Sequence, residues 1–158
     1  MIDISKSVDF NTYMRDKDEE HFNIYKNTVL SDETKDTIKS LNEERKVLIF
    51  SEGYCPDCTV AIPFIKRLEE ENNNIELEFF KREGNEEFLE EAVGDARIPS
   101  ILVFDGEMNP LGAYVEFPEE LKEKIQISNL ENKKHIVKEF REGKYNSLIE
   151  ESFLNILK

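Results

Sequence analysis

The sequence predicts an α/β fold: a three-layer sandwich with a mixed four-stranded sheet, extended by further helices at both ends. Two observations predict it. Between residues 46 and 93, short apolar runs alternate with amphipathic stretches in the order strand, helix, strand, helix. Two further apolar runs, 100–104 and 111–115, flank a turn over 105–107 and therefore form a hairpin. A sheet assembled in this way is covered by helices on both faces.

Local signals fix where the elements begin and end. The unbroken apolar run from Val47 to Phe50 is typical of a strand that is buried on both faces. Pro56 suits the first position of a helix, because its missing N–H would have no partner there. Gly94 and Gly143 are expected helix ends. The predicted elements are one or two helices within 7–29, a helix over 32–44, a strand over 46–50, a helix over 56–71, a strand over 75–81, a helix over 85–93, strands over 100–104 and 111–115, a helix opened by Pro118, and two helices within 130–158.

The chain length of 158 residues fits one compact domain. Within it we expect three parts. Residues 1–45 form N-terminal helices packed on the core, residues 46–127 form the core itself, and residues 128–158 form a C-terminal helical extension.

Composition narrows the function classes. The formal net charge is −14 and the sequence pI is about 4.6, so electrostatic repulsion opposes binding to nucleic acid or to an anionic membrane. Residues 1–7 lack the basic and apolar parts of a secretory signal, and no stretch is apolar enough to span a bilayer. We therefore expect a cytoplasmic protein with neither nucleic acid nor membrane as a partner.

The chain contains two cysteines, Cys55 and Cys58, in a C-x-x-C arrangement directly after the apolar strand. Structural disulfides are kept reduced in the cytosol, so such a pair indicates catalysis or metal binding. A zinc site would need two more ligands, and the chain offers only His21 and His135, which we expect to be solvated on charged helices. Two inert, buried thiols are the remaining alternative. Thiol–disulfide exchange fits the pattern best, and no metal is expected.

The position of each cysteine suggests its role. A thiol at a helix N-terminus is acidified by the helix dipole and by unpaired N–H groups, which makes Cys55 the expected nucleophile. Cys58 lies inside the first turn and would resolve a mixed disulfide held on Cys55. The carboxylate of Asp57 repels a thiolate on either neighbour. We therefore expect a reducing pair, with a potential at or below roughly −270 mV.

Four features in order resemble the thioredoxin superfamily, over residues 46–118. They are the apolar strand, Cys55-Pro56-Asp57-Cys58, Pro63, and Arg97-Ile98-Pro99-Ser100 before a further strand. The resemblance implies a thioredoxin-like fold in which Pro99 forms a cis peptide beside the cysteines. It also implies that the backbone of Ile98 pairs with an extended substrate segment. The Cys-Pro-Asp-Cys motif, together with the helices at both ends, is similar to a group of bacterial thioredoxin-like proteins.

The sequence departs from the thioredoxin pattern at two positions. Thioredoxins bury an aspartate six residues before the first cysteine, where it manages the proton of the resolving thiol, and Ile49 occupies that position here. Tyr54 stands where thioredoxins have tryptophan. Glu52 and Asp57 are the acids nearest in sequence that could substitute for the aspartate; otherwise proton transfer relies on water.

The expected function is that of a thiol–disulfide oxidoreductase, active in cell redox homeostasis. Cys55 and Cys58 would reduce a protein or small-molecule disulfide, supported by Tyr54, Pro56, Asp57, Ile98 and Pro99. No bound cofactor is expected; an external enzyme such as thioredoxin reductase would supply electrons. Two alternatives stay open: a partner-binding module or redox sensor without general turnover, and an oxidase or isomerase, which would require export.

Overall fold

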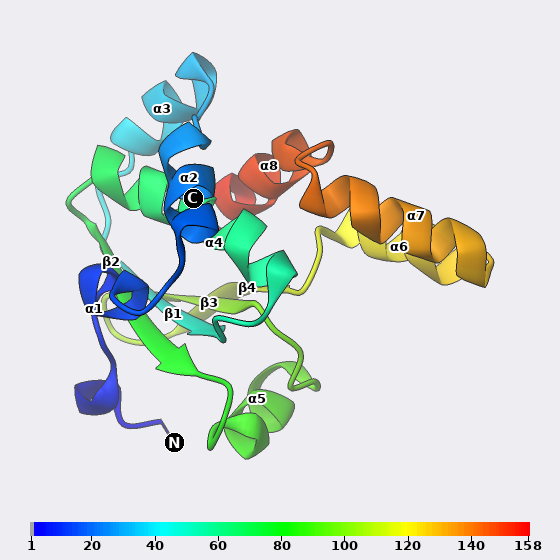
Figure 1. Cartoon of the computed structure of the whole chain (residues 1–158). Helices are drawn as coiled ribbons and strands as arrows, with labels where there is room; N and C mark the ends of the chain where they lie inside the picture. Colours follow the sequence, from blue (N-terminus) through cyan, green and yellow to red (C-terminus); the bar gives the residue numbers. More distant parts are fainter. Residues whose placement is uncertain (1) are drawn as a thin grey trace.

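The structure is built on a four-stranded mixed sheet with the strand order β2-β1-β3-β4 (Figure 1). The computed structural model describes residues 2–158. The β1 strand pairs in parallel with β2 and antiparallel with β3, and β3 pairs antiparallel with β4. This arrangement confirms the predicted mixed sheet with a terminal hairpin. The strands are β1 (Arg45–Ser51), β2 (Ile75–Lys81), β3 (Ser100–Asp105) and β4 (Pro110–Val115).

The central strand β1 divides the core into two layers. Val47 and Ile49 belong to one hydrophobic cluster, whereas Leu48 and Phe50 belong to another. All four side chains are fully buried. Successive residues of a strand point to opposite faces of the sheet, so the apolar run supplies both layers at once.

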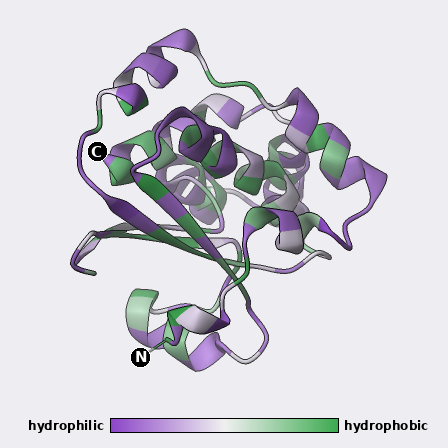
Figure 2. Cartoon of the chain, turned by 90° about the vertical axis from the view of Figure 1, so that its left-hand side faces the viewer, coloured by the Kyte–Doolittle hydropathy of each residue, from purple (hydrophilic) through white to green (hydrophobic). Residues whose placement is uncertain are grey.

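Helices cover the two faces unequally. The α4 helix, which follows Cys55, lies on one face of the sheet together with α8, α3 and α2. The α5 helix and the short η1 lie on the other face beside the N-terminus (Figure 1). Figure 2 shows the same division, with a larger group of helices on one side of the strands and a smaller one on the other. The helices are η1 (Ile4–Lys6), α1 (Phe10–Met14), α2 (Glu19–Asn27), α3 (Asp32–Lys39), α4 (Pro56–Glu71), α5 (Glu86–Val93), α6 (Glu119–Ile127), α7 (Leu130–Arg141) and α8 (Asn146–Leu157).

Most helix ends agree with the sequence signals. Gly94 and Gly143 adopt positive φ values of 79° and 91° after α5 and α7, a conformation that glycine reaches without a steric penalty. The α3 helix ends at Lys39, so the prediction that it would extend to residue 44 is wrong. The Asn72 amide donates to the carbonyls of Ile38 and Leu41, both at 2.7 Å, and these bonds satisfy the end of the helix early.

Both ends of the chain contribute to the main core. Leu30 and Ile38 from the N-terminal part share one cluster with Phe153 and Leu157 from α8. The Phe153 ring meets the Tyr114 ring of β4 edge-to-face, with centroids 4.6 Å apart. These terminal helices therefore bury apolar surface on the sheet itself. Within residues 2–158, no helix combines the length and the apolar character that crossing a membrane requires.

A pair of isoleucine substitutions measures how much α8 contributes to stability. Ile149 is fully buried in α8, whereas Ile127, at the end of α6, is 87% exposed. We expect Ile149→Ala to lower the free energy of unfolding by about 2–5 kcal/mol, because it leaves a cavity in the core. The matched control Ile127→Ala should change it by less than about 0.5 kcal/mol. Urea denaturation followed by circular dichroism measures both values, and equal effects would contradict the assignment of α8 to the core.

Candidate active site

The two cysteines lie at the N-terminus of α4, where the chain turns after β1. Cys55 is the N-cap residue and Pro56 occupies the first helical position. The Cys55 sulfur accepts a hydrogen bond from the backbone N–H of Cys58 at 3.2 Å. Both residues are free thiols. Cys55 is 8% exposed and Cys58 is fully buried, so Cys55 is the more accessible residue of the two.

The pKa values of the two thiols move in opposite directions. The hydrogen bond that the Cys58 thiol donates lowers the pKa of Cys55, and backbone N–H groups of the helix add to this effect. Burial and the charge of Asp57 oppose it. Burial raises the pKa of Cys58 far above that of an ordinary thiol, and the neighbouring Cys55 raises it further. When one proton is lost from the pair, it therefore leaves Cys55 rather than Cys58.

The loop before β3 forms the wall beside the cysteines. The peptide bond between Ile98 and Pro99 is cis, as the family resemblance implies. The carbonyl oxygen of Ile98 lies 3.8 Å from the Cys55 sulfur and can accept a weak hydrogen bond from its thiol. Pro99 is buried and Ile98 is partly exposed. This geometry brings Cys55, Ile98 and Pro99 together, although they are far apart in sequence.

Asp57 is buried at 6% exposure and forms an ion pair with Arg141 of α7. The Arg141 Nε donates to Oδ1 of Asp57 at 2.9 Å, and a terminal guanidinium nitrogen donates to Oδ2 at 3.3 Å. A guanidinium that contacts both carboxylate oxygens partly offsets the negative charge beside Cys55. Sequence reasoning missed Arg141, because no local pattern links residues that are 84 positions apart.

Both acids nearest to the motif are engaged by other groups. Ile49 is fully buried in the core. Both oxygens of Asp57 are engaged by Arg141, and Glu52 accepts a hydrogen bond from the backbone N–H of Glu83 at 2.9 Å. On β1, Ser51 is the next residue that points to the same face as Ile49. Its hydroxyl is 2.7 Å from the hydroxyl of Tyr13. No local sequence pattern marks either residue as part of the site.

The prediction that His21 is solvated is wrong. Its side chain is only 13% exposed, with Nδ1 2.7 Å from Asp18 and Nε2 3.1 Å from the Thr59 hydroxyl. Thr59 in turn donates to the carbonyl of Cys55 at 3.1 Å. Packing of α2 on α4 therefore ties this histidine to the backbone of the site. His135 is on the surface as predicted, with a side chain that is 69% exposed.

A pocket of about 310 Å³ is lined by residues on both sides of Cys55 in the sequence, although not by Cys55 itself. Tyr54 and Pro56 line it from the motif, His21 from α2, and Arg141 from α7. Tyr54 is 74% exposed, so its ring is available for contact with a substrate. Among residues 2–158, no group of three or more histidine, cysteine or acidic side chains is placed to hold a metal ion.

Opposite charge changes at Asp57 and Arg141 test how this ion pair affects Cys55. Asp57→Asn removes a negative charge, so the pKa of Cys55 should fall and the reduction potential should rise. Arg141→Gln removes a positive charge and should raise the pKa of Cys55. The pH dependence of alkylation by iodoacetamide, followed by mass spectrometry, measures the midpoint for Cys55. The exposed Asp36→Asn on α3 is the control, and shifts of the same sign in both site variants would contradict this account.

Comparisons with known proteins agree with the fold. The chain is similar to a crystal structure of a protein of unknown function from Pseudomonas aeruginosa, with a TM-score of 0.79 and 20% identity over 98% of this chain and 93% of that one. It is also similar to an HIV epitope-scaffold, with a TM-score of 0.78 and 18% identity over 98% and 94% of the two chains. A search of curated proteins found no match. A family model described as thioredoxin matches residues 4–134, and the chain, with its thioredoxin-like fold, therefore belongs to the thioredoxin superfamily.

Proposed function

We propose that the protein is a cytoplasmic thiol–disulfide oxidoreductase that acts as a dithiol reductant. The observation that carries this proposal is the asymmetry of the pair: an acidified, reachable Cys55 at the cap of α4 and a fully buried Cys58 within its first turn. Nucleophilic attack needs a thiolate that substrate can reach. Cys55 meets both requirements, and Cys58 is placed to act second.

The reaction proceeds in two displacements. The Cys55 thiolate attacks one sulfur of a substrate disulfide, forms a mixed disulfide and releases the first substrate thiolate. Cys58 then loses its proton and attacks the Cys55 sulfur, so that a Cys55–Cys58 bond forms and the second substrate thiolate leaves. The protein has given up two electrons. An external dithiol donor such as thioredoxin reductase returns them, with no cofactor bound to the protein itself.

Substrate recognition in this proposal uses the backbone beside the cis proline. An extended peptide lying along Ile98 would present its disulfide to Cys55, whose sulfur is 3.8 Å from the Ile98 carbonyl. Tyr54 offers an exposed ring at the edge of this path. The substrate would be a protein or small-molecule disulfide, with no nucleic acid or membrane involved.

A second candidate function is that of a partner-binding module or redox sensor. The observation that favours it is that elements outside the motif help to form the pocket next to Tyr54 and Pro56, with α2 and α7 supplying His21 and Arg141. Such walls restrict which disulfides can approach. A dedicated partner could then be held or released according to the oxidation state of the pair.

Trapping of mixed disulfides tests the assigned roles. Cys58→Ser should retain substrates covalently on Cys55, because the resolving thiol is absent, and non-reducing gels should show these adducts. Cys55→Ser should trap nothing, because the remaining thiol is buried and its pKa is raised. Equal trapping by the two variants would reverse the roles proposed here.

Turnover separates the two candidate functions. A general reductant should reduce insulin disulfides when it is coupled to NADPH through thioredoxin reductase, with an initial rate proportional to protein concentration. The double variant Cys55→Ser/Cys58→Ser is the matched control and should be inactive. A wild-type protein whose Cys55 is titratable but which shows no turnover with either insulin or a small disulfide would favour the sensor.

A further inference from the structure

The buried position of Cys58 creates a problem for its own reaction. Its sulfur must lose a proton before it attacks the mixed disulfide, yet it is fully buried and its thiolate is strongly disfavoured. A carboxylate at position 49 would accept that proton, and Ile49 cannot. The nearest acids are engaged by Arg141 and by the backbone of Glu83. Buried hydroxyl groups beside the cysteines offer the proton another way out.

Ser51 is the polar side chain that β1 directs toward the cysteines. Because residues of a strand alternate between faces, Ser51 shares the face of Ile49 and Val47, which is the face covered by α4. It is buried, with 2% exposure. Its hydroxyl opposes the rise that burial causes in the pKa of Cys58. Tyr13, which bonds the Ser51 hydroxyl, lines the same small cavity as Cys58, so this pair of hydroxyls lies on the side of α4 that carries the sulfur to be deprotonated.

Tyr13 continues this contact away from the cysteines. Its hydroxyl is 2.7 Å from the Ser51 hydroxyl, so the two form a hydrogen bond. Its ring stacks on Phe79 with centroids 4.8 Å apart, and the Lys17 ammonium lies 4.4 Å from the ring centroid on another side. The tyrosine is held in place by α1, an element that precedes the cysteine motif by about 40 residues in the chain.

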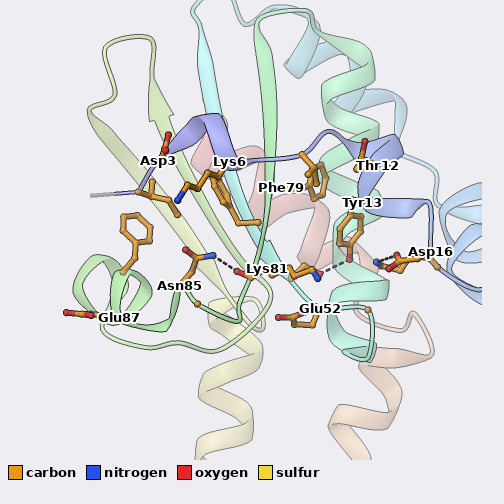
Figure 3. A pocket seen from close by; sticks show the side chains of 18 of the residues that line it. Asp3, Lys6, Thr12, Tyr13, Asp16, Glu52, Phe79, Lys81, Asn85 and Glu87 are labelled. Carbon is orange, nitrogen blue, oxygen red and sulfur yellow. Dashed lines mark hydrogen bonds and ion pairs between the residues drawn. The ribbon is translucent and has the colours of Figure 1, made fainter.

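A cavity of about 820 Å³ borders this pair of hydroxyl-bearing residues (Figure 3). It is large enough for many water molecules and is lined by both Tyr13 and Ser51. Figure 3 shows Tyr13 directed into the region between Glu52 and Asp16. The charged residues that line the cavity are Asp3, Lys6, Asp16, Lys17, Glu52, Lys81, Glu87 and Glu91.

We propose that Ser51 and Tyr13 relay the proton of Cys58 to solvent in this cavity during resolution of the mixed disulfide. This inference rests on the proposed reductase function. The Cys58 proton passes to the Ser51 oxygen, the Ser51 proton to the Tyr13 oxygen, and the Tyr13 proton to water. Each hydroxyl ends with as many protons as it began with. The Cys58 thiolate then attacks Cys55, and the substrate thiolate leaves with the electron pair of the broken bond.

The relay gives a role to the N-terminal helix α1. A direct route through His21 is less suited, because its Nδ1 and Nε2 atoms already bond Asp18 and Thr59. Tyr13 is a positioning residue in this scheme, since it acts on Cys58 through Ser51. Loss of either hydroxyl should slow resolution while the first attack by Cys55 continues.

An aromatic disulfide that releases a coloured thiolate, DTNB, separates the two steps in one stopped-flow trace. With less than one equivalent of DTNB, the first release reports attack by Cys55 and the second reports resolution by Cys58. We expect Ser51→Ala to slow the second release by about tenfold or more at neutral pH and to shift its pH profile to higher pH. Tyr13→Phe should slow it in the same direction and by a smaller factor. Ser51→Thr keeps the hydroxyl and should restore most of the rate.

The control is Tyr25→Phe, which removes a hydroxyl that bonds Glu70 from the same N-terminal region and leaves the relay intact. It should resolve at the wild-type rate. A structural role alone would lower thermal stability without moving the pH profile. The proposal is overturned if Ser51→Ala and Tyr13→Phe both resolve with the wild-type rate and pH profile, or if His21→Asn shifts the profile instead. A wild-type protein that gives no first release would refute the proposed function itself, which makes the two failures distinguishable.

Discussion

The N-terminus of α4 is the constraint on which the site depends. Its free N–H groups and dipole stabilise an anion at the cap. The sulfur of Cys55 accepts a hydrogen bond from one of these groups, the backbone N–H of Cys58, at 3.2 Å. The same turn places Cys58 in the interior, where a thiolate is unfavourable. One helix end therefore makes two chemically similar residues unequal, and the proposed order of the two displacements follows from that inequality.

Much of the fold follows from local patterns, because alternation in strands and glycines after helices act over a few residues. The run from Val47 to Phe50 predicts a central strand, and Pro56 after Cys55 predicts the helix start; both agree with the structure. The early end of α3 could not be predicted in this way. The Asn72 side chain bonds the carbonyl of Ile38 within α3 and that of Leu41 just beyond it, and both residues are more than 30 positions away in the sequence.

The difference between local patterns and contacts of distant residues also separates the predictable part of the site from the rest. The resemblance to thioredoxins predicts that Pro99 lies beside the cysteines, because the short motif around Pro99 can be recognised in the sequence. Arg141, His21 and Tyr13 reach the site through packing of α7, α2 and α1, and each contact joins residues at least 38 positions apart. A charged or aromatic residue on an amphipathic helix carries no local signal that its side chain reaches residues next to the cysteines. The terminal helices thus supply much of what is specific to this site.

The neutral hydroxyls of Ser51 and Tyr13 suit a site that already contains the buried carboxylate of Asp57. A second buried carboxylate at position 49 would stand near the Asp57 carboxylate and the Cys55 thiolate, and like charges in a poorly solvated region repel strongly. Arg141 pairs with Asp57. Its single positive charge would be too small to balance two carboxylates and a thiolate together. Ser51 and Tyr13 stay neutral, because burial raises the pKa of Tyr13 well above its ordinary value. Neutral hydroxyls can pass a proton without adding charge, so a site that keeps an acid within the cysteine motif is better served by a hydroxyl relay than by a second acid.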